Sequence, residues 1–243
     1  MNKKIIISGA FSGIGMQAAI DLSLKGYEII ALGRNEQKIS NLSNKLHGKN
    51  HIFKIVDLEI EEDVKKVLLD LKNNGIKVSG VVCCAGSHMV KPIKVSKNAD
   101  YKSLMASNFY SFTNIISNIG KLIEKDSSIV GISSAGVIRS AKAVSAYASS
   151  KMALEGFVRS AALEFARNGV RINLISPGVV STEMTKEFMS SIGLEASEQM
   201  NQSHPLGIGS PEDVSNLINF LISNKSKWIT GQNIIIDGGF SIN

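Results

Sequence analysis

The sequence is poor in cysteine, proline and aromatic residues, and it contains no long hydrophobic run. Only 2 of its 243 residues are cysteines, which excludes the disulfide framework typical of small secreted domains. No run approaches the roughly 18 apolar residues that a membrane-spanning helix needs. The N-terminal apolar run is three isoleucines before Ser8, too short for a signal peptide. We therefore expect a soluble cytoplasmic protein.

Positive charge exceeds negative charge, but it is not concentrated. The chain has 27 lysines and arginines against 21 acidic residues, a formal net charge of +6. The lysines are scattered, and aromatic residues, which could stack on unpaired bases, make up only 6% of the chain. Nucleic acid is therefore not an expected partner, whereas a small anionic ligand fits the charge equally well.

Seven short apolar segments alternate with longer segments of helical spacing. The apolar segments, rich in β-branched residues, are KKIIISG, YEIIALG, HIFKIVDL, GVVCCAG, SSIVGISS, VRINLISPG and QNIIIDGG. Between them apolar residues recur every three or four positions, as in Ile14, Ala18 and Leu22. This alternation predicts βαβ units that form a parallel sheet with helices on both faces, in one domain. The least regular stretch, about 183–208, is predicted to be a lid or binding loop.

A glycine-rich turn follows the first apolar segment. In SGAFSGIG the glycines are Gly9, Gly13 and Gly15. Glycine allows a sharp turn and a close approach of the backbone to a pyrophosphate, and the next helix presents free N–H groups to the phosphates. This spacing, after a strand and before a helix, predicts a dinucleotide-binding loop. A turn without a ligand is the alternative.

The end of the second apolar segment indicates which dinucleotide binds. An acid at this place would hold the hydroxyl groups of the adenosine ribose and repel a 2′-phosphate. The chain has Gly33 and Arg34 there, and an arginine suits a phosphate through charge-assisted hydrogen bonds. We therefore predict NADP(H), with NAD(H) as the alternative cofactor and a solvated surface arginine as the alternative interpretation. Asp57, after the third segment, is a candidate for the adenine amino group or simply a helix-entry acid.

A serine, a tyrosine and a lysine are spaced for acid–base chemistry. Tyr147 and Lys151 are four residues apart and share one helix face, while Ser134 ends a strand, where α/β sheets bind ligands. A tyrosine has an ordinary pKa of about 10, so we expect the Lys151 ammonium and a nicotinamide charge to lower it. The serine hydroxyl is expected to hold a substrate oxygen as charge develops on it.

Together these segments resemble the classical short-chain dehydrogenase/reductase family over nearly the whole chain. The resemblance rests on SGAFSGIG, VDL, CCAG, Asn108, ISS, YASSK, INLISPGVVSTEM and the tail from PLGIGSPEDV to WITGQNIIIDGG, and it is strongest to 3-oxoacyl-carrier-protein reductases. It implies a single doubly wound Rossmann fold over residues 1–243, with a seven-stranded parallel sheet in the order 3-2-1-4-5-6-7. It also implies an NADP(H)-dependent oxidoreductase that reduces a carbonyl to a secondary alcohol.

The resemblance implies a role for each residue that matches the family pattern. Tyr147 would donate the proton, and Lys151 would bind the nicotinamide ribose and lower the tyrosine pKa. Ser134, rather than its neighbour Ser133, would orient the carbonyl, and Asn108 would hold a proton-relay water through its helix backbone. The implied cofactor-binding residues, besides Tyr147 and Lys151, are Gly9, Ser12, Gly13, Ile14, Gly15, Arg34, Asp57, Leu58, Cys84, Ala85, Gly86, Pro177, Gly178, Val180 and Thr182.

The chain departs from the family pattern at Ser8, usually threonine, and at Cys83 and Cys84, where the family usually has two asparagines. Adjacent strand residues point to opposite faces, and no third cysteine completes a tetrahedral set. Neither a metal site nor a redox pair is therefore expected. We interpret the two cysteines as small buried thiols that replace two amides.

Substrate and partners are weakly encoded. The candidate substrate contacts are His88, Arg139, Lys142 and Met184, and the two basic residues would suit an anionic substrate unless they are solvated loop charges. An acyl carrier protein is a further candidate partner. The alternative functions are an NAD(P)-dependent dehydrogenase of a sugar or other secondary alcohol, and a non-catalytic dinucleotide-binding regulator. Small side chains along the helices expected at about 98–122 and 146–168 resemble the family's dimer and tetramer contacts, which implies a homodimer or homotetramer, and burial within one chain is the alternative.

Overall fold

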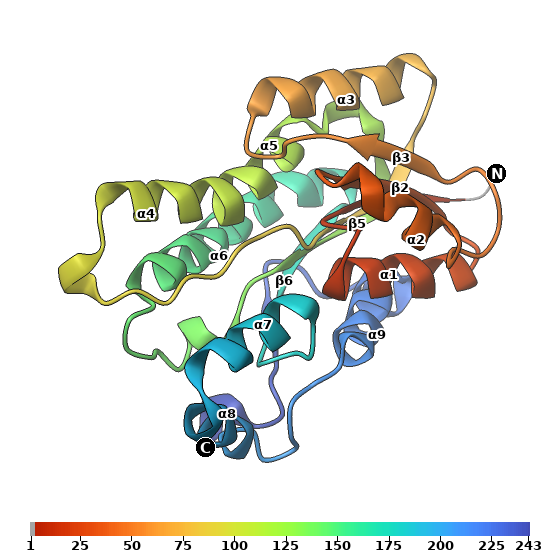
Figure 1. Cartoon of the computed structure of the whole chain (residues 1–243). Coiled ribbons are helices and arrows are strands. Elements are labelled where there is room, and N and C mark those ends of the chain that lie inside the picture. Colours follow the sequence, from red (N-terminus) through yellow and green to blue (C-terminus); the bar gives the residue numbers. More distant parts are fainter. Residues whose placement is uncertain (1–2) are drawn as a thin grey trace.

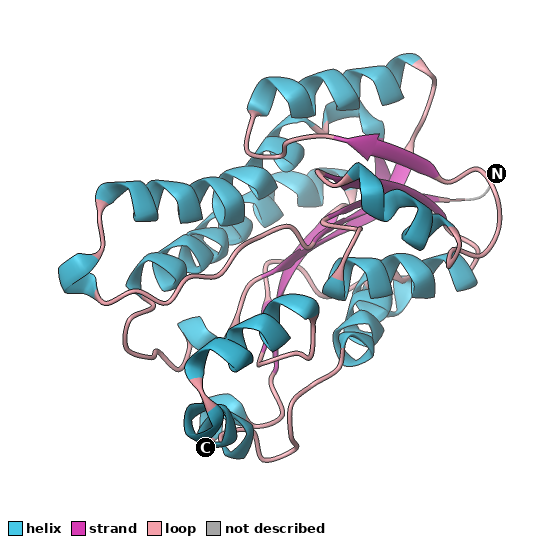
Figure 2. Cartoon of the chain, in the orientation of Figure 1, coloured by secondary structure: helices cyan, strands magenta, loops and turns pink. Residues whose placement is uncertain are grey.

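The computed structural model describes residues 3–243 and contains one seven-stranded parallel sheet. The strand order is β3-β2-β1-β4-β5-β6-β7, and each neighbouring pair is parallel. The strands are β1 (Lys4–Ser8), β2 (Glu28–Gly33), β3 (Ile52–Ile55), β4 (Val78–Cys83), β5 (Ile123–Ile132), β6 (Arg171–Pro177) and β7 (Asn233–Ile236). The predicted fold class and strand order are thus confirmed. Figure 2 shows the strands as one twisted layer between helices.

Helices cover both faces of the sheet (Figure 1). They are α1 (Gly13–Leu24), α2 (Ile39–Ser43), α3 (Glu61–Asn73), α4 (Asn98–Leu104), α5 (Ser111–Asn118), α6 (Ser145–Phe165), α7 (Glu183–Ile192), α8 (Leu194–Gln202) and α9 (Pro211–Ile222). Helices α1 and α9 pack together on one face, and α3, α5 and α6 lie on the other.

Strand residues divide between the two cores by the alternation of a β-strand. Ile6 belongs to the core beneath α3, α5 and α6, whereas Ile5 and Ile7 belong to the core beneath α1 and α9. All three side chains are fully buried. Because both faces of every central strand are covered, these strands are continuously apolar rather than alternating in polarity.

The start of α9 follows the capping signal in its sequence. Ser210 Oγ accepts a hydrogen bond from the Asp213 backbone N–H at 3.3 Å, and Asp213 Oδ2 accepts one from the Ser210 N–H at 2.7 Å. Pro211 occupies the first helical position, where its missing N–H costs nothing. The capped helix fixes the end of the chain segment that leads from α7 and α8 back to the sheet.

The stretch at about 183–208 is more regular than its sequence predicts. Most of it forms α7 and α8, which are separated by Gly193 at a φ of +82°. Thr182 begins α7 because its Oγ1 accepts a hydrogen bond from the Thr185 N–H at 3.2 Å. The expectation of an irregular loop was wrong. The apolar pattern of this stretch is too short to indicate a helix, but a capping threonine and residues that favour helices are sufficient to form one. That residues 183–208 act as a lid over the substrate remains a prediction.

The helix expected at about 98–122 is also divided. Between α4 and α5 lies a π-helical turn, Met105–Tyr110, which contains Asn108. Turns of this kind carry one extra residue per turn and are frequent at functional sites. The turn changes the direction in which Asn108 and Ser107 point, and apolar periodicity cannot predict it.

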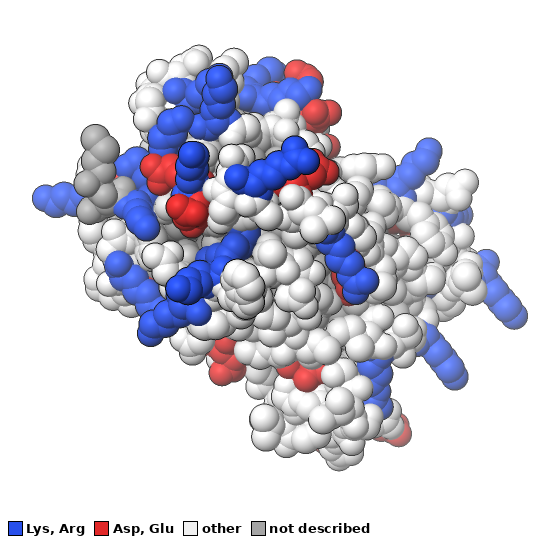
Figure 3. Space-filling model, turned by 180° about the vertical axis from the view of Figure 1, so that it is seen from behind, with Lys and Arg blue, Asp and Glu red and all other residues white. Residues whose placement is uncertain are grey.

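Basic side chains are spread over the surface. Figure 3 shows lysines and arginines distributed over the face opposite that of Figure 1, with acidic side chains between several of them. Within residues 3–243 no helix is both long and apolar enough to cross a membrane. In that same range no group of three or more histidine, cysteine or acidic residues is arranged to hold a metal ion.

Candidate active site

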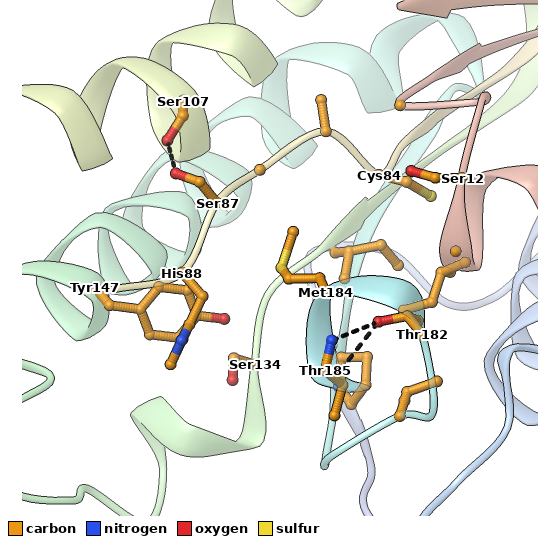
Figure 4. Close-up of a pocket in the computed structure, with 18 of the residues that line it drawn as sticks. Ser12, Cys84, Ser87, His88, Ser107, Ser134, Tyr147, Thr182, Met184 and Thr185 are labelled. Carbon is orange, nitrogen blue, oxygen red and sulfur yellow. Dashed lines mark hydrogen bonds between the residues drawn. The ribbon is translucent and has the colours of Figure 1, made fainter. Parts of the chain in front are cut away.

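A cavity of about 840 Å³ opens at the carboxyl ends of the central strands. Its walls are the β1–α1 turn, the ends of β2 and β4, the segment after β5, the start of α6 and the chain from Pro177 into α7. Every residue that the sequence predicts as a catalytic, cofactor or substrate contact lines this cavity, with the exception of Asn108. The topology thus places segments that are far apart in the chain around one space (Figure 4).

The glycines of the first turn are required by close backbone packing. A Cβ on Gly9, whose φ is +65°, would lie 2.8 Å from the Ala85 backbone nitrogen. A Cβ on Gly15 would lie 2.3 Å from the Gly9 carbonyl oxygen. The turn therefore lies directly against the segment after β4, and the N-terminus of α1, where Ser12 is the N-cap, opens into the cavity. Such a bare backbone cradle at a helix N-terminus suits a pyrophosphate.

Ser134 and Tyr147 lie side by side in the cavity (Figure 4). Ser134 caps the short turn that follows β5, and its Oγ accepts a hydrogen bond from the Gly136 N–H at 3.1 Å. Burial raises the pKa of the Tyr147 phenol, and hydrogen bonding from Ser134 opposes this in part. The phenol is therefore protonated at neutral pH. The lowering expected from Lys151 together with a nicotinamide charge remains a prediction.

Lys151 lies one helical turn after Tyr147 and is buried, with 5% of its surface exposed. Its Nζ donates a hydrogen bond to the Ile132 carbonyl at 2.8 Å. Burial lowers the pKa of this ammonium to about 8. The side chain is thus held at the end of β5 beside the cavity, where it can donate to a ribose hydroxyl or stabilise a phenolate.

Asn108 does not line the cavity but fixes one of its walls. Its Nδ2 donates to the Ser87 carbonyl at 3.0 Å and to Ser150 Oγ at 2.9 Å, and its Oδ1 accepts from the Ser87 N–H at 2.9 Å. Gly86 leaves room for this amide, since a Cβ there would lie 2.5 Å from Asn108 Oδ1 and 3.2 Å from Lys151 Nζ. Asn108 therefore joins the segment after β4 to α6, next to Lys151. The relay water expected from the sequence remains a prediction.

Charged residues surround the end of the cavity after β2. Arg34 Nη1 lies 3.2 Å from Glu59 Oε1, and the side chain of Arg34 is largely exposed. Asp57 Oδ1 accepts a hydrogen bond from the Glu59 N–H at 3.0 Å, so its carboxylate also shapes the turn after β3. A Cβ on Gly33 would lie 2.5 Å from Phe11 Cδ2. The ring of Phe11 therefore occupies the space that a side chain at position 33 would need.

The two cysteines lie on opposite sides of the sheet, as the sequence predicts. Cys83 belongs to the core beneath α3, α5 and α6, while Cys84 packs against the other core and lines the cavity. Both are free thiols. Burial raises the pKa of Cys83 to about 12 and raises that of Cys84 further. Both thiols therefore stay protonated, and the Cys84 backbone N–H donates to the Ser8 carbonyl at 3.1 Å.

The candidate substrate contacts occupy the end of the cavity beside Tyr147. The His88 ring stands edge-on to Tyr147, with centroids 4.6 Å apart, and burial lowers its pKa. Arg139 Nη1 donates to the Phe240 carbonyl at 2.8 Å, and its guanidinium lies 5.0 Å from the Phe240 ring centroid. Lys142 lines the cavity, and Met184 projects from α7 into it (Figure 4). Arg139 is thus partly engaged by the C-terminal segment.

Sequence reasoning missed several residues of the cavity. The Phe188 ring lies 5.2 Å from that of His88, and its position one turn after Met184 could have placed it on the same helix face. Ser87 and Ser107 share a hydrogen bond of 2.6 Å that no sequence pattern reveals. Lys38, Glu59 and Glu183 also line the cavity. Their ion pairs join residues that are distant in sequence, so residue spacing could not predict that these side chains line the cavity.

The fold and the site define a dinucleotide-binding oxidoreductase, and comparisons with known proteins agree. A family model described as enoyl-(acyl carrier protein) reductase matches residues 9–241. The chain is 31% identical to carbonyl reductase family member 4 of Danio rerio over 244 residues, covering 100% of this chain and 99% of the relative. It is 32% identical to the 3-oxoacyl-[acyl-carrier-protein] reductase FabG of Rickettsia prowazekii, covering 98% of this chain and 96% of that protein.

A solved structure of a short chain dehydrogenase family protein from Francisella tularensis superposes with a TM-score of 0.88 at 27% sequence identity, covering 100% of both chains. The chain belongs to the classical short-chain dehydrogenase/reductase family. The family binds a nicotinamide dinucleotide. The backbone cradle at Gly9 and Gly15 and the buried Lys151 beside it fit such a ligand.

Proposed function

We propose that this protein is an NADP(H)-dependent reductase that converts a carbonyl group into a secondary alcohol. The observation that carries the proposal is the convergence of Ser134, Tyr147 and Lys151 in the cavity that also contains the glycine cradle. The relatives described as carbonyl and 3-oxoacyl reductases support it too.

Each residue of the set has a defined task in this reaction. The reduced nicotinamide, when bound, supplies the hydride to the carbonyl carbon. Ser134 donates a hydrogen bond to the carbonyl oxygen and so orients it. Tyr147 transfers its phenolic proton to that oxygen as negative charge develops there. The Lys151 ammonium stabilises the resulting phenolate, and Asn108 keeps the segment after β4 in place beside Lys151.

The preference for NADP(H) is supported by the end of β2. Arg34 is exposed at the cavity and can reach a phosphate, and Phe11 packs where an acid would have to stand to favour NAD(H). An arginine binds phosphate through two parallel charge-assisted hydrogen bonds, which a ribose without a 2′-phosphate cannot accept. The remaining cofactor contacts proposed for this chain line the same cavity, and they are the glycine turn, Asp57, Leu58, Cys84, Ala85, Gly86, Tyr147, Lys151, Pro177, Gly178, Val180 and Thr182.

The substrate is proposed to lie between Ser134, Tyr147 and α7. His88 and Met184 would contact the group beside the carbonyl, and Arg139 and Lys142 would lie further out. An acyl carrier protein as donor of the substrate is supported only by the similarity to carrier-protein reductases. A thioester such as acetoacetyl-coenzyme A tests this directly, since its failure to react would remove fatty-acid chemistry from consideration.

We further propose a cytoplasmic location and a homodimer or homotetramer. The two free thiols support a reducing compartment. Apolar side chains on the outside of α6 support assembly, because Met152 is 46% and Leu163 is 77% exposed. Light scattering of the purified protein measures the oligomeric state.

The experiment that tests the function is a screen of ketones, aldehydes and thioesters with NADPH and NADH, and of sugars and other secondary alcohols with NADP⁺ and NAD⁺. We expect at least one carbonyl compound to accelerate NADPH oxidation, with kcat/KM for NADPH above that for NADH by roughly tenfold or more. Oxidation of a sugar with NAD⁺ as the fastest reaction would instead favour the secondary-alcohol dehydrogenase. Cofactor binding without any turnover across the screen would favour a non-catalytic regulator.

A further inference from the structure

Two charged side chains meet across the opening of the cofactor cavity. Lys38 ends the short turn Glu36–Lys38 after β2, and Glu183 is the first residue of α7. Lys38 Nζ donates a hydrogen bond to Glu183 Oε2 at 2.6 Å, although the two residues are 145 positions apart. Both line the cavity. This ion pair therefore joins the wall formed by the β2 loop to the helix on the opposite side.

The start of α7 is held in place against the glycine turn. Thr182 caps the helix, and its methyl carbon lies 3.2 Å from the position a Cβ on Gly13 would take. The neighbouring Glu183 carboxylate is surrounded by cations. The hydrogen bond from Lys38, with the charges of Lys38, Lys186 and Lys45, lowers its pKa. Glu183 is therefore ionised at neutral pH and holds the Lys38 ammonium in the absence of another anion.

A 2′-phosphate would compete for the same ammonium. Arg34 and Lys38 lie on one loop, four residues apart, and each is paired with a carboxylate, Glu59 and Glu183 respectively. Both pairs are exposed, and exposed pairs contribute little net free energy. A phosphate monoester carries a greater negative charge than a carboxylate and offers three acceptor oxygens. It can therefore displace Glu183 from Lys38, whereas a ribose hydroxyl cannot.

We propose that Lys38 is a second 2′-phosphate-binding residue and that Glu183 competes with the phosphate for it, so that NADP(H) binding breaks the link between the β2 loop and α7. The inference rests on the proposed use of NADP(H). In this proposal Glu183 influences the affinity for the cofactor, although it belongs to α7, the helix that covers the substrate end of the cavity. The 2′-phosphate, far from the reacting carbon, is thereby coupled to the position of α7.

The test is a double-mutant cycle with dissociation constants for NADPH, NADH and adenosine 2′,5′-bisphosphate measured by titration calorimetry. Glu183→Gln should tighten NADPH binding about threefold, because the phosphate no longer has to displace a carboxylate, and should change NADH binding less than about twofold. Lys38→Gln should weaken NADPH binding roughly five- to tenfold and leave NADH nearly unchanged. The double variant should bind NADPH like Lys38→Gln, since Glu183 acts through Lys38.

Glu187→Gln is the matched control, because Glu187 lies one turn further along α7, lines the same cavity and carries the same charge. It should leave NADPH affinity unchanged. Equal tightening by Glu187→Gln, or tightening by Glu183→Gln in the Lys38→Gln background, would show general charge repulsion and overturn the inference. If the wild type prefers NADPH and Lys38→Gln keeps that preference, the inference about Lys38 and Glu183 is overturned while the proposed use of NADP(H) stands. A wild type that binds NADH as tightly as NADPH overturns the proposed cofactor as well.

Discussion

Replacing Lys151 by methionine should stabilise the fold while it removes activity. Lys151 is 5% exposed, and burial lowers the pKa of its ammonium from 10.5 to about 8. The two pKa values differ by about 2.5, and a difference of one corresponds to about 1.4 kcal/mol, so keeping the charged form in the folded state at neutral pH costs about 3.5 kcal/mol. The hydrogen bond from Nζ to the Ile132 carbonyl offsets about 1 kcal/mol of this. We therefore expect Lys151→Met to raise the free energy of unfolding by about 2.5 kcal/mol.

The same residue should make the stability of the wild type depend on pH. Its folded-state pKa lies below the unfolded value, so between about pH 8 and pH 10.5 the unfolded chain binds more protons than the folded chain. The free energy of unfolding therefore gains a contribution from Lys151 that rises with pH through this window. The contribution is absent from Lys151→Met, so the difference in stability between the two proteins should shrink as the pH rises.

Urea denaturation followed by circular dichroism measures this difference, at about pH 7 and about pH 10. Lys66→Met serves as the control for loss of a lysine, because the Lys66 side chain is 76% exposed and its substitution should change stability by less than about 0.5 kcal/mol. A Lys151→Met protein that unfolds at lower urea than the wild type at neutral pH would refute the reasoning. It would show that the hydrogen bond to Ile132 outweighs the desolvation of the ammonium.

Two further substitutions test the packing around the cofactor cavity. Cys83→Asn should lower the free energy of unfolding by about 1–3 kcal/mol, because it places an amide in an apolar core. An unchanged urea midpoint would show that hydrogen-bond partners for the amide remain in that core. Gly33→Asp should bring its Cβ against the Phe11 ring, so we expect lower thermal stability and no improvement in NADH binding. The double variant with Phe11→Ala should recover stability and bind NADH more tightly than the wild type. NADH affinity that rises in Gly33→Asp alone would contradict the role assigned to Phe11.

Local pattern was sufficient for the fold class, and the family resemblance supplied the strand order and many, but not all, of the residues around the cavity. Strands such as Lys4–Ser8 are short apolar runs between helical segments, and that alternation leaves few topologies open. Tyr147 and Lys151 are four residues apart in one helix, so their shared face follows from spacing alone. The strand order brings the segment after β4 between the glycine turn and α6, which accounts for the common cavity.

Properties that depend on long-range contacts did not follow from the sequence. The ion pair between Lys38 and Glu183 joins residues 145 positions apart, and neither residue type is unusual at its place. The π-helical turn at Asn108 interrupts a stretch whose apolar pattern is continuous. The burial of the Tyr147 phenol, which raises its pKa, depends on the assembled fold and could not be read from residue spacing.

The most direct measurement of the central claim compares the wild type with Tyr147→Phe in carbonyl-dependent NADPH oxidation, with NADPH affinity determined on the same samples. Tyr101→Phe is the control, because the Tyr101 hydroxyl does not line the cavity. It lies 3.2 Å from Ser145 Oγ at the start of α6. We expect Tyr147→Phe to lose turnover by at least about 100-fold and to bind NADPH within about twofold of the wild type. Turnover by Tyr147→Phe equal to that of the wild type and of Tyr101→Phe would contradict Tyr147 as the proton donor.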